Sequence, residues 1–286
     1  MANKKDVLNI RGITDARYAN LVEAASKISM RASGRFKSAS EVALELSSRF
    51  HISTGSTELD AILGGGMESC SLTEIYGEYR TGKSQLTMTL AVTAQLGSRP
   101  GKVIYVDTEG AFRPERLATI CARFGVDHNT VLDNILFARV FTTDQQEEVP
   151  IQVEAKIDED ETPYSLLVID SMMALWRTDF SGRGELSERQ QRIGRHLNML
   201  KKLAERHNLA VVYTNQVMSD PSGGMTYVSD PKKPVGGHVI AHAATTRLFF
   251  KKGRDNERVA KVVDSPNMPE AEGRFLITES GIADSE

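Results

Sequence analysis

The residues with the most specific chemistry lie at positions 77–84, where the sequence GEYRTGKS matches the pattern G-x-x-x-x-G-K-[ST]. A loop with this pattern turns its backbone N–H groups toward the phosphates of a nucleotide, and glycine permits the tight turn. The Lys83 ammonium group reaches the β and γ phosphates, and the Ser84 hydroxyl is a ligand for Mg²⁺. We therefore predict a site for ATP and Mg²⁺, with Lys83 also acting in catalysis. The predicted nucleotide contacts of the loop are Gly77, Glu78, Tyr79, Arg80, Thr81, Gly82, Lys83, Ser84 and Gln85.

The elements that must position this loop are visible on either side of it. Residues 71–76 alternate like a β-strand, and residues 86–96 have helical periodicity without glycine or proline. A strand, a glycine-containing loop and a helix follow one another in this motif. A chance match within an ordinary glycine turn is the alternative, and the flanking pattern disfavours it.

Length and composition limit the class of protein. The chain has 286 residues, 40% of them apolar, which suits one large α/β domain with a small appendage. It has no apolar stretch of about 18 residues and no apolar signal-peptide segment, so no membrane association is expected. Two cysteines, Cys70 and Cys121, lack the spacing of a metal site or redox pair, which favours a reducing compartment. With a net charge of -3, any charge that binds nucleic acid must be concentrated locally.

Strand-like and helix-like segments alternate through most of the chain. We predict a mostly parallel twisted sheet with helices on both faces and antiparallel strands toward the C-terminus. The predicted strands are 102–106, 135–141, 165–170, 209–214, 245–250, 257–263 and 274–278, and the predicted helices are 114–124, 144–160 and 185–207. We expect three parts: a helical segment at 1–30, a linker at 31–50 and an ATPase core at 51–286.

Two features of the N-terminal region leave alternatives open. Residues 7–30 read as two helices joined by a glycine turn, which could bind a DNA phosphate or serve only in packing. Phe36 stands alone among polar residues of the linker. It could pack against its own domain or anchor in a pocket of a neighbouring molecule, where its burial would contribute about 1.5–3 kcal/mol.

Three predicted strands end in polar side chains that could act on a bound nucleotide. Ligands of open α/β sheets bind at the carboxyl ends of the strands. Asp170 could hold Mg²⁺ directly or through a water molecule, and Glu109 could deprotonate the attacking water. Gln216 could sense the γ-phosphate and pass the signal into the loop that follows it. Taken alone, either acid could instead be a helix cap or a surface carboxylate.

Two long loops have a composition suited to a nucleic-acid backbone. Residues 177–185 contain two arginines and two glycines, and residues 217–237 are rich in glycine, proline and lysine. Arginines and backbone amides in such loops hold phosphates without reading the base sequence. The alternative is a pair of surface loops with ordinary charge.

With these motifs the chain resembles a known family, the RecA-type DNA strand-exchange recombinases of eukaryotes. It most resembles their meiosis-specific branch. The resemblance extends from position 36 to the C-terminus. It is strongest in the segments DTEGAFRPERL (107–117), DFSGRGELSERQQ (179–191), DPKKPVGGH (230–238) and DSPNMPEAE (264–272).

The resemblance implies a role for further residues. Phe36 and Ala39 match a polymerisation motif that docks on the adjacent subunit. Arg116 matches a residue that stacks on adenine, while Asp264 and Pro269 match a cap that one subunit places over its neighbour's nucleotide. The residues that match DNA-contacting positions are Arg177, Arg183, Arg189, Pro221, Gly236 and Gly237.

The resemblance also implies a function. It predicts a DNA-dependent ATPase of the nucleus that forms filaments on single-stranded DNA, pairs it with homologous duplex DNA in meiotic recombination and break repair, and works with accessory proteins. An accessory paralogue that binds ATP and assists another recombinase remains an alternative, as does a ring-forming motor such as a hexameric helicase. The sequence departs from the family at 1–30, which is shorter than the family's N-terminal domain, and at the acidic stretch 143–163.

Overall fold

The computed structural model describes residues 13–14, 17–18, 20–21, 24, 36–180, 182, 184–219 and 232–285. The chain divides into two units, Met1–Ser48 and Arg49–Glu286. Most of the helical segment expected at 1–30 lies outside the described residues.

The first unit contains the helix α3 (Ala39–Leu46). Ser38 caps its N-terminus: the Ser38 hydroxyl accepts a hydrogen bond from the Glu41 N–H, and the Glu41 carboxylate accepts one from the Ser38 N–H. Such a reciprocal cap stabilises a helix by roughly 1 kcal/mol for each bond. Phe36, which precedes the cap, is fully exposed. The Phe36 side chain is therefore presented next to a locally stabilised helix.

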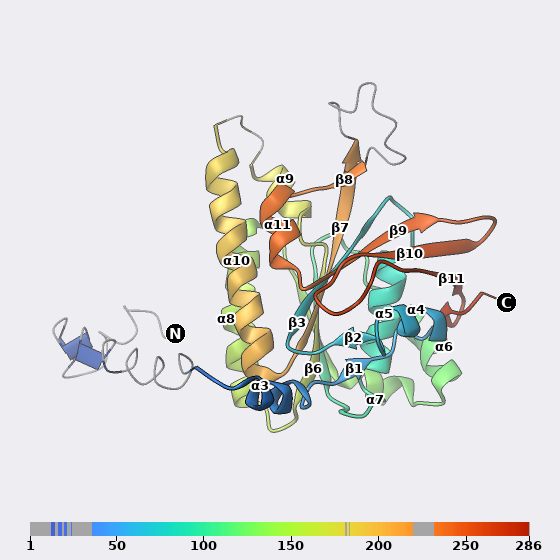
Figure 1. Cartoon of the computed structure of the whole chain (residues 1–286), viewed down its shortest axis with the longest axis horizontal. Helices are drawn as coiled ribbons and strands as arrows, with labels where there is room; N and C mark the ends of the chain where they lie inside the picture. Colours follow the sequence, from blue (N-terminus) through green and yellow to red (C-terminus); the bar gives the residue numbers. More distant parts are fainter. Residues whose placement is uncertain are drawn as a thin grey trace. The chain divides into compact units, whose positions relative to one another are not determined.

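The second unit is built on a ten-stranded sheet with the strand order β12-β11-β10-β9-β3-β7-β6-β4-β5, and β8 pairs with β7 (Figure 1). Its strands are β3 (Ser71–Gly77), β4 (Lys102–Asp107), β5 (Ile135–Arg139), β6 (Tyr164–Asp170), β7 (Ala210–Ser219), β8 (Lys232–Pro234), β9 (Thr246–Lys252), β10 (Glu257–Asp264), β11 (Glu272–Thr278) and β12 (Gly281–Ala283). The strands from β9 to β5 in this order are parallel. Antiparallel pairing begins between β9 and β10. A separate two-stranded sheet joins β1 (His51–Ile52) and β2 (Met67–Glu68).

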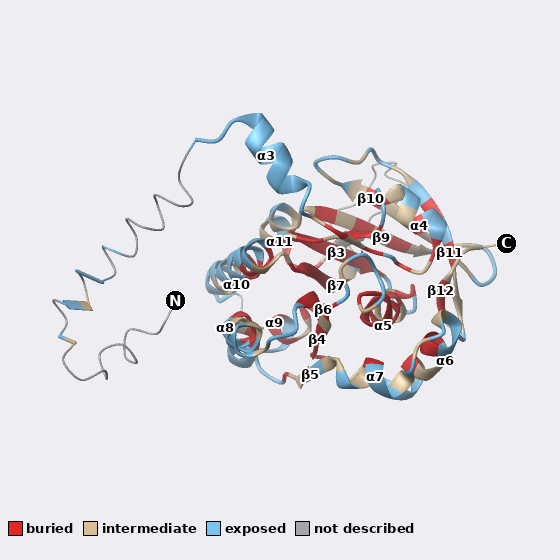
Figure 2. Ribbon diagram, turned by 90° about the horizontal axis from the view of Figure 1, so that it is seen from below, coloured by how far each residue is buried: buried red, intermediate tan, exposed pale blue. Residues whose placement is uncertain are grey.

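Helices cover both faces of the large sheet (Figure 2). On one face lie α8 (Thr143–Glu159), α9 (Ala174–Thr178), α10 (Leu186–His207) and α11 (Gly237–Ala243); on the other lie α4 (Thr57–Ile62), α5 (Lys83–Thr93), α6 (Pro114–Phe124) and α7 (His128–Asp133). Alternate residues of each central strand enter opposite cores. In β6, for example, Leu167 and Ile169 pack with Trp176 and Leu197, whereas Val168 packs toward Leu90. Burial on both faces explains why these strands read as continuous apolar runs.

The fold class predicted from the sequence is confirmed. Two local expectations need correction. The second loop was expected at 217–237, but β7 continues to Ser219 and forms an antiparallel hairpin with β8. Arg177, expected in a loop, lies in the last turn of α9. Short extended or helical pieces at the ends of loops carry too few residues for their periodicity to be recognised. Among the helices of the described segments, none has the length and apolar character needed to cross a membrane.

Candidate functional site

The carboxyl ends of four neighbouring parallel strands form one polar edge of the sheet. The register pairs Gly77 at the end of β3 with Gln216 of β7, and Asp107 at the end of β4 with Asp170 of β6. The phosphate loop, the predicted magnesium ligand and the predicted γ-phosphate sensor therefore meet because these strands run in the same direction.

The phosphate loop joins β3 to α5. Gly82 has φ 103° and is the N-cap of α5, so the residue needs the freedom of glycine. A side chain at Gly77 would bring its Cβ to 2.2 Å from the Phe250 carbonyl oxygen. The Lys83 ammonium group donates hydrogen bonds to the carbonyl oxygens of Gly77 (3.0 Å) and Glu78 (2.8 Å). The positive charge thus lies inside the loop, beside the N-terminus of an 11-residue helix.

A cavity of about 910 Å³ opens at this edge of the sheet. Its volume lies within the range of small-molecule sites, about 300–1,000 Å³. Every predicted loop residue from 77 to 85 lines it. The other predicted site residues that line it are Glu109, Arg116, Asp170 and Gln216.

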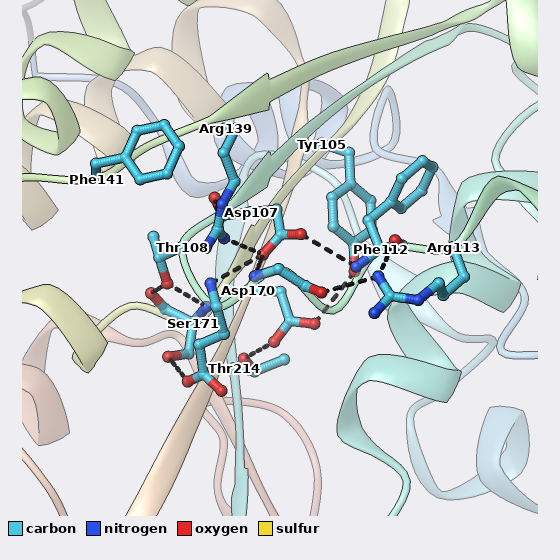
Figure 3. A network of polar contacts seen from close by, with 12 residues as sticks. Tyr105, Asp107, Thr108, Phe112, Arg113, Arg139, Phe141, Asp170, Ser171 and Thr214 are labelled. Atoms are coloured by element: carbon cyan, nitrogen blue, oxygen red, sulfur yellow. Dashed lines mark hydrogen bonds and ion pairs between the residues drawn. The ribbon is translucent and has the colours of Figure 1, made fainter.

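Asp170 is the most buried acid of the cavity. Its carboxylate accepts hydrogen bonds from the hydroxyls of Thr214 and Tyr105, the latter at 3.2 Å (Figure 3). Burial raises the pKa of the Asp170 carboxyl, and hydrogen bonds from Thr214 and Ser84 oppose the rise. Ser84 and Asp170 therefore face each other and offer two oxygen atoms, the ligand type that Mg²⁺ prefers.

The charged groups around the cavity also affect the pKa of Lys83. Burial lowers the pKa of the Lys83 ammonium group, and the negative charges of Asp170, Glu109 and Glu78 oppose this change. Lys83 lies among acids and backbone carbonyls and forms no ion pair with another described residue, so it is suited to receive a polyanion.

Asp107 anchors the segment that carries Glu109. The Asp107 Oδ1 accepts hydrogen bonds from the N–H groups of Glu109 (2.9 Å) and Gly110 (2.6 Å), and Oδ2 accepts one from the Phe112 N–H (3.1 Å). Arg139 adds an ion pair to the Asp107 Oδ1 at 2.9 Å (Figure 3). The turn after β4 therefore has a defined conformation that directs Glu109 into the cavity.

Side-chain contacts continue from Glu109 across the sheet. The Glu109 Oε1 accepts hydrogen bonds from the Ser171 hydroxyl (2.5 Å) and from the Gln216 Nε2 (3.0 Å). The Gln216 Oε1 in turn accepts a hydrogen bond from the Arg177 Nη1 (3.0 Å). A residue predicted to bind DNA is thus connected to the predicted catalytic acid through one glutamine.

A buried polar cluster supports β7 next to Gln216. The Asn215 Nδ2 donates to the Glu74 Oε1 (2.8 Å) and to the Val235 carbonyl oxygen (2.7 Å), and the Arg247 Nε donates to the Glu74 Oε2 (2.7 Å). Glu74 and Asn215 are fully buried. The Asn215 Oδ1 accepts a hydrogen bond from the Gln216 N–H (2.8 Å), so this cluster fixes the backbone at Gln216.

The other end of the cavity is basic. The Arg116 Nε donates to the Gln85 Oε1 at 2.9 Å, and its terminal nitrogens donate to the carbonyl oxygens of Thr278 and Glu279. These bonds fix the plane of the guanidinium group, which is the property needed to stack on a base. Arg113 and Arg258 also line the cavity.

Several predicted residues lie away from this cavity. Asp264, at the end of β10, and Pro269 are exposed and do not line it. Arg189 lies on α10, and its Nε is buried without a hydrogen-bond partner among the described residues. Gly236 is the N-cap of α11, Gly237 begins that helix, and the Gly236 carbonyl oxygen accepts a hydrogen bond from Gln190 (3.1 Å). Arg183 and Pro221 lie outside the described residues.

The residues of the site that sequence reasoning missed include Tyr105, Asp107, Ser171, Thr214 and Arg258. Asp107 carried a usable signal, because an aspartate at a strand end followed by a glycine three residues later is typical of a turn held by its side chain. The other four are ordinary strand or strand-end residues, and their role depends on pairing between distant segments.

Together, the crossover sheet, the phosphate loop and the strand-end acid define a P-loop ATPase of the RecA type. Comparison with protein-family models finds a match to the Rad51 family over residues 46–285. The chain belongs to the Rad51 family.

Comparison with individual relatives identifies the branch of the family that the chain resembles. The chain is 50% identical over 289 aligned positions to the "Meiotic recombination protein DMC1/LIM15 homolog" of Homo sapiens, covering 100% of this chain and 84% of that protein. It is 49% identical to the protein of the same name from Mus musculus, with the same coverage. The "Meiotic recombination protein DMC1 homolog" of Glycine max is 48% identical, with 82% of its length covered. The chain is therefore a recombinase of the meiotic branch, as the motifs predicted.

Proposed function

We propose that this protein is an ATP-dependent DNA strand-exchange recombinase of the nucleus, which assembles on single-stranded DNA and pairs it with homologous duplex DNA during meiotic recombination and double-strand-break repair. The observation that carries the proposal is the connected set Arg177–Gln216–Glu109 at the edge of the nucleotide cavity. It joins an arginine proposed to contact DNA to the proposed ATPase site, as an ATP-regulated DNA-binding protein requires.

In the proposed hydrolysis, the oxygen of a water molecule attacks the γ-phosphorus, and the bond between that phosphorus and the β–γ bridging oxygen breaks. Glu109 takes the proton of the water. Lys83 and the N–H groups of the loop stabilise the negative charge on the phosphates. Ser84 and Asp170 would hold Mg²⁺, which would supply positive charge to stabilise the phosphates. Arg116 holds the adenine by stacking.

DNA binding is proposed at the face that carries the two loops. Arg177 is exposed there, and Gly236 and Gly237 place backbone N–H groups at the start of α11. The proposed DNA contacts are Arg177, Arg183, Arg189, Pro221, Gly236 and Gly237. Such contacts hold the sugar–phosphate backbone and leave the base edges free, so homology is tested by base pairing.

Self-assembly is proposed through the linker. Phe36 is fully exposed, and Ala39 begins α3. The edge strand β5 presents the exposed side chains Leu136 and Phe137, and its outer edge has no paired strand among the described residues. An extended segment of a second copy could add to such an edge and bury its phenylalanine. In the resulting filament or ring, Asp264 and Pro269 would cover the nucleotide of the adjacent subunit, and accessory recombination proteins would act on the assembly.

A joint-molecule assay tests the proposal. The full chain with ATP or a non-hydrolysable analogue should convert homologous single-stranded and duplex DNA into joint molecules, and heterologous duplex should give none. The Lys83→Ala variant should fail, because the phosphate site loses its charge. The Glu109→Gln variant should form joint molecules but hydrolyse ATP at least about 100-fold more slowly. Failure of the parent protein with both nucleotides would support the alternative function, an accessory paralogue that binds ATP but assists another recombinase.

A further inference from the structure

Arg177 occupies a position that neither ATP binding nor DNA binding by itself explains. It lies in the last turn of α9, is exposed, and donates a hydrogen bond from Nη1 to the Gln216 Oε1 at 3.0 Å. The same glutamine donates from Nε2 to the Glu109 Oε1 at 3.0 Å. Gln216 is therefore held at both ends of its amide, by a cation on one side and by an acid on the other.

The two partners determine which way the amide points. A guanidinium group only donates hydrogen bonds, and an ionised carboxylate only accepts them. With Arg177 on one side and Glu109 on the other, the amide oxygen must face Arg177 and the amide nitrogen must face Glu109. Turning the amide over would place donor against donor and acceptor against acceptor. Arg177 thus sets the orientation of Gln216 without touching the nucleotide cavity.

The same arrangement also engages the Glu109 carboxylate in hydrogen bonds. Its Oε1 already accepts hydrogen bonds from Ser171 (2.5 Å) and Gln216 (3.0 Å). While Gln216 is held in this way, one of its two side-chain N–H groups is directed to Glu109 instead of to a phosphate or to the attacking water.

We infer that Arg177 is a positioning residue that restrains Gln216 and Glu109 while DNA is absent, and that a DNA phosphate releases the restraint by taking Arg177 for itself. The inference rests on the proposed function and adds to it a way for DNA to control hydrolysis. A hydrogen bond from arginine to a charged phosphate is roughly twice as strong as one to a neutral amide. The phosphate therefore competes successfully for a guanidinium group that is exposed to it.

The test is the rate of ATP hydrolysis without DNA, because this rate is independent of DNA affinity. Arg177→Met keeps an unbranched apolar side chain and removes the guanidinium donor. It should raise the DNA-free rate about three- to tenfold, the effect of losing one restraining hydrogen bond. The stimulation by saturating single-stranded DNA should fall by the same factor.

Arg195→Met is the matched control. Arg195 is an exposed arginine of α10, so this variant loses the same charge at a surface position. It should leave the DNA-free rate and the stimulation ratio unchanged. An unchanged or lower DNA-free rate in Arg177→Met would overturn the inference and leave Arg177 as a DNA contact only.

A double variant separates this inference from the proposed function. In a Gln216→Ala background, Arg177→Met should change the DNA-free rate by less than about twofold, since the contact that transmits the restraint is already absent. An additive effect would contradict the route through Gln216. The proposed function is tested independently by joint-molecule formation in the parent protein, which does not depend on the DNA-free rate.

Discussion

The Asp107 carboxylate sets the backbone conformation at Glu109, because its Oδ1 accepts a hydrogen bond from the Glu109 N–H at 2.9 Å. Two further N–H groups of the same turn, those of Gly110 and Phe112, donate to this carboxylate. Asp107 is nearly fully buried and lies opposite Asp170 in the sheet. The predicted general base is thus positioned by a second acid that does not itself contact the cavity.

The first prediction concerns Asp107→Asn. The amide keeps one acceptor oxygen but places an NH₂ donor against backbone N–H groups, so the turn should shift. A displacement of about 1 Å can reduce a rate by about 100-fold. We expect kcat for ATP hydrolysis to fall by about 10- to 100-fold and KM for ATP to change little. Arg139→Met removes the ion pair to the Asp107 carboxylate, the hydrogen bond to the Asp107 carbonyl oxygen (3.1 Å) and the contact with the Phe141 ring. It leaves the backbone N–H bonds to Asp107 in place, so it should lower kcat by less than about threefold. Equal kcat values for the parent and Asp107→Asn would show that the anchor is unnecessary.

A second prediction concerns Asp170→Asn. Burial raises the pKa of the Asp170 carboxyl. A folded-state pKa above the unfolded value means that the ionised form is disfavoured in the folded protein at neutral pH. The neutral amide should therefore raise the Tm of the ligand-free protein by about 2–4 °C. The Mg²⁺ concentration for half-maximal ATP hydrolysis should rise at least about tenfold. Thermal unfolding with a chelator and a Mg²⁺ titration measure the two effects; a lower Tm would contradict the first.

The third prediction concerns His196, a buried residue of α10 beside Trp176. Neither ring nitrogen has a hydrogen-bond partner among the described residues. An unsatisfied buried polar group costs about 1–3 kcal/mol. His196→Leu should therefore increase the free energy of unfolding at pH 7 by about that amount, as measured by urea denaturation.

The same residue should make stability depend on pH. Burial lowers the pKa of His196 to about 4 from an ordinary value of 6.5. The unfolded chain then binds more protons between these values, so stability is lost as the pH falls through this window, by roughly 3 kcal/mol in all. His196→Leu should remove this part of the acid sensitivity. A His128→Gln control should retain it, and identical pH profiles for the parent and His196→Leu would contradict the assignment.

The fourth prediction concerns self-assembly. Phe36→Ala should prevent oligomers from forming on single-stranded DNA with ATP, because burial of this side chain contributes about 1.5–3 kcal/mol at every subunit contact. The Tm of the protein should be unchanged, since Phe36 is fully exposed. Leu44→Ala truncates another exposed apolar side chain, on α3, and should assemble normally. Electron microscopy and light scattering provide the measurement. Normal assembly of Phe36→Ala would place the contact elsewhere.

Much of the site was predictable because its signals are local in sequence. The phosphate loop is one continuous segment between a strand and a helix, and its residues line the cavity as a group. Glu109, Asp170 and Gln216 were predicted because each lies at or just beyond the end of an apolar run, and parallel strands end at one edge. The direction of the strands was enough to bring these residues together.

Contacts between distant segments could not be predicted in the same way. The Arg177–Gln216 bond joins residues 39 positions apart, and the Ser171–Glu109 bond joins residues 62 positions apart. Both depend on the order β6–β7 and β4–β6 in the sheet and on the height at which each strand ends. The periodicity of apolar residues along the chain indicates which residues are buried, but it does not indicate the order of the strands in the sheet.

The sequence by itself determined that the chain has the core of a RecA-type ATPase. The loop and its flanking elements form one continuous segment, and each strand-end acid lies at or just beyond the end of an apolar run. Only the tertiary structure decided how these parts contact one another. Asp107 holds Glu109, Arg177 orients Gln216, and the buried His196 has no hydrogen-bond partner in the described part of the chain. The physical reason is that a hydrogen bond needs atoms within about 3 Å in a suitable direction, and only the packed sheet with its helices brings side chains from separate segments to that distance.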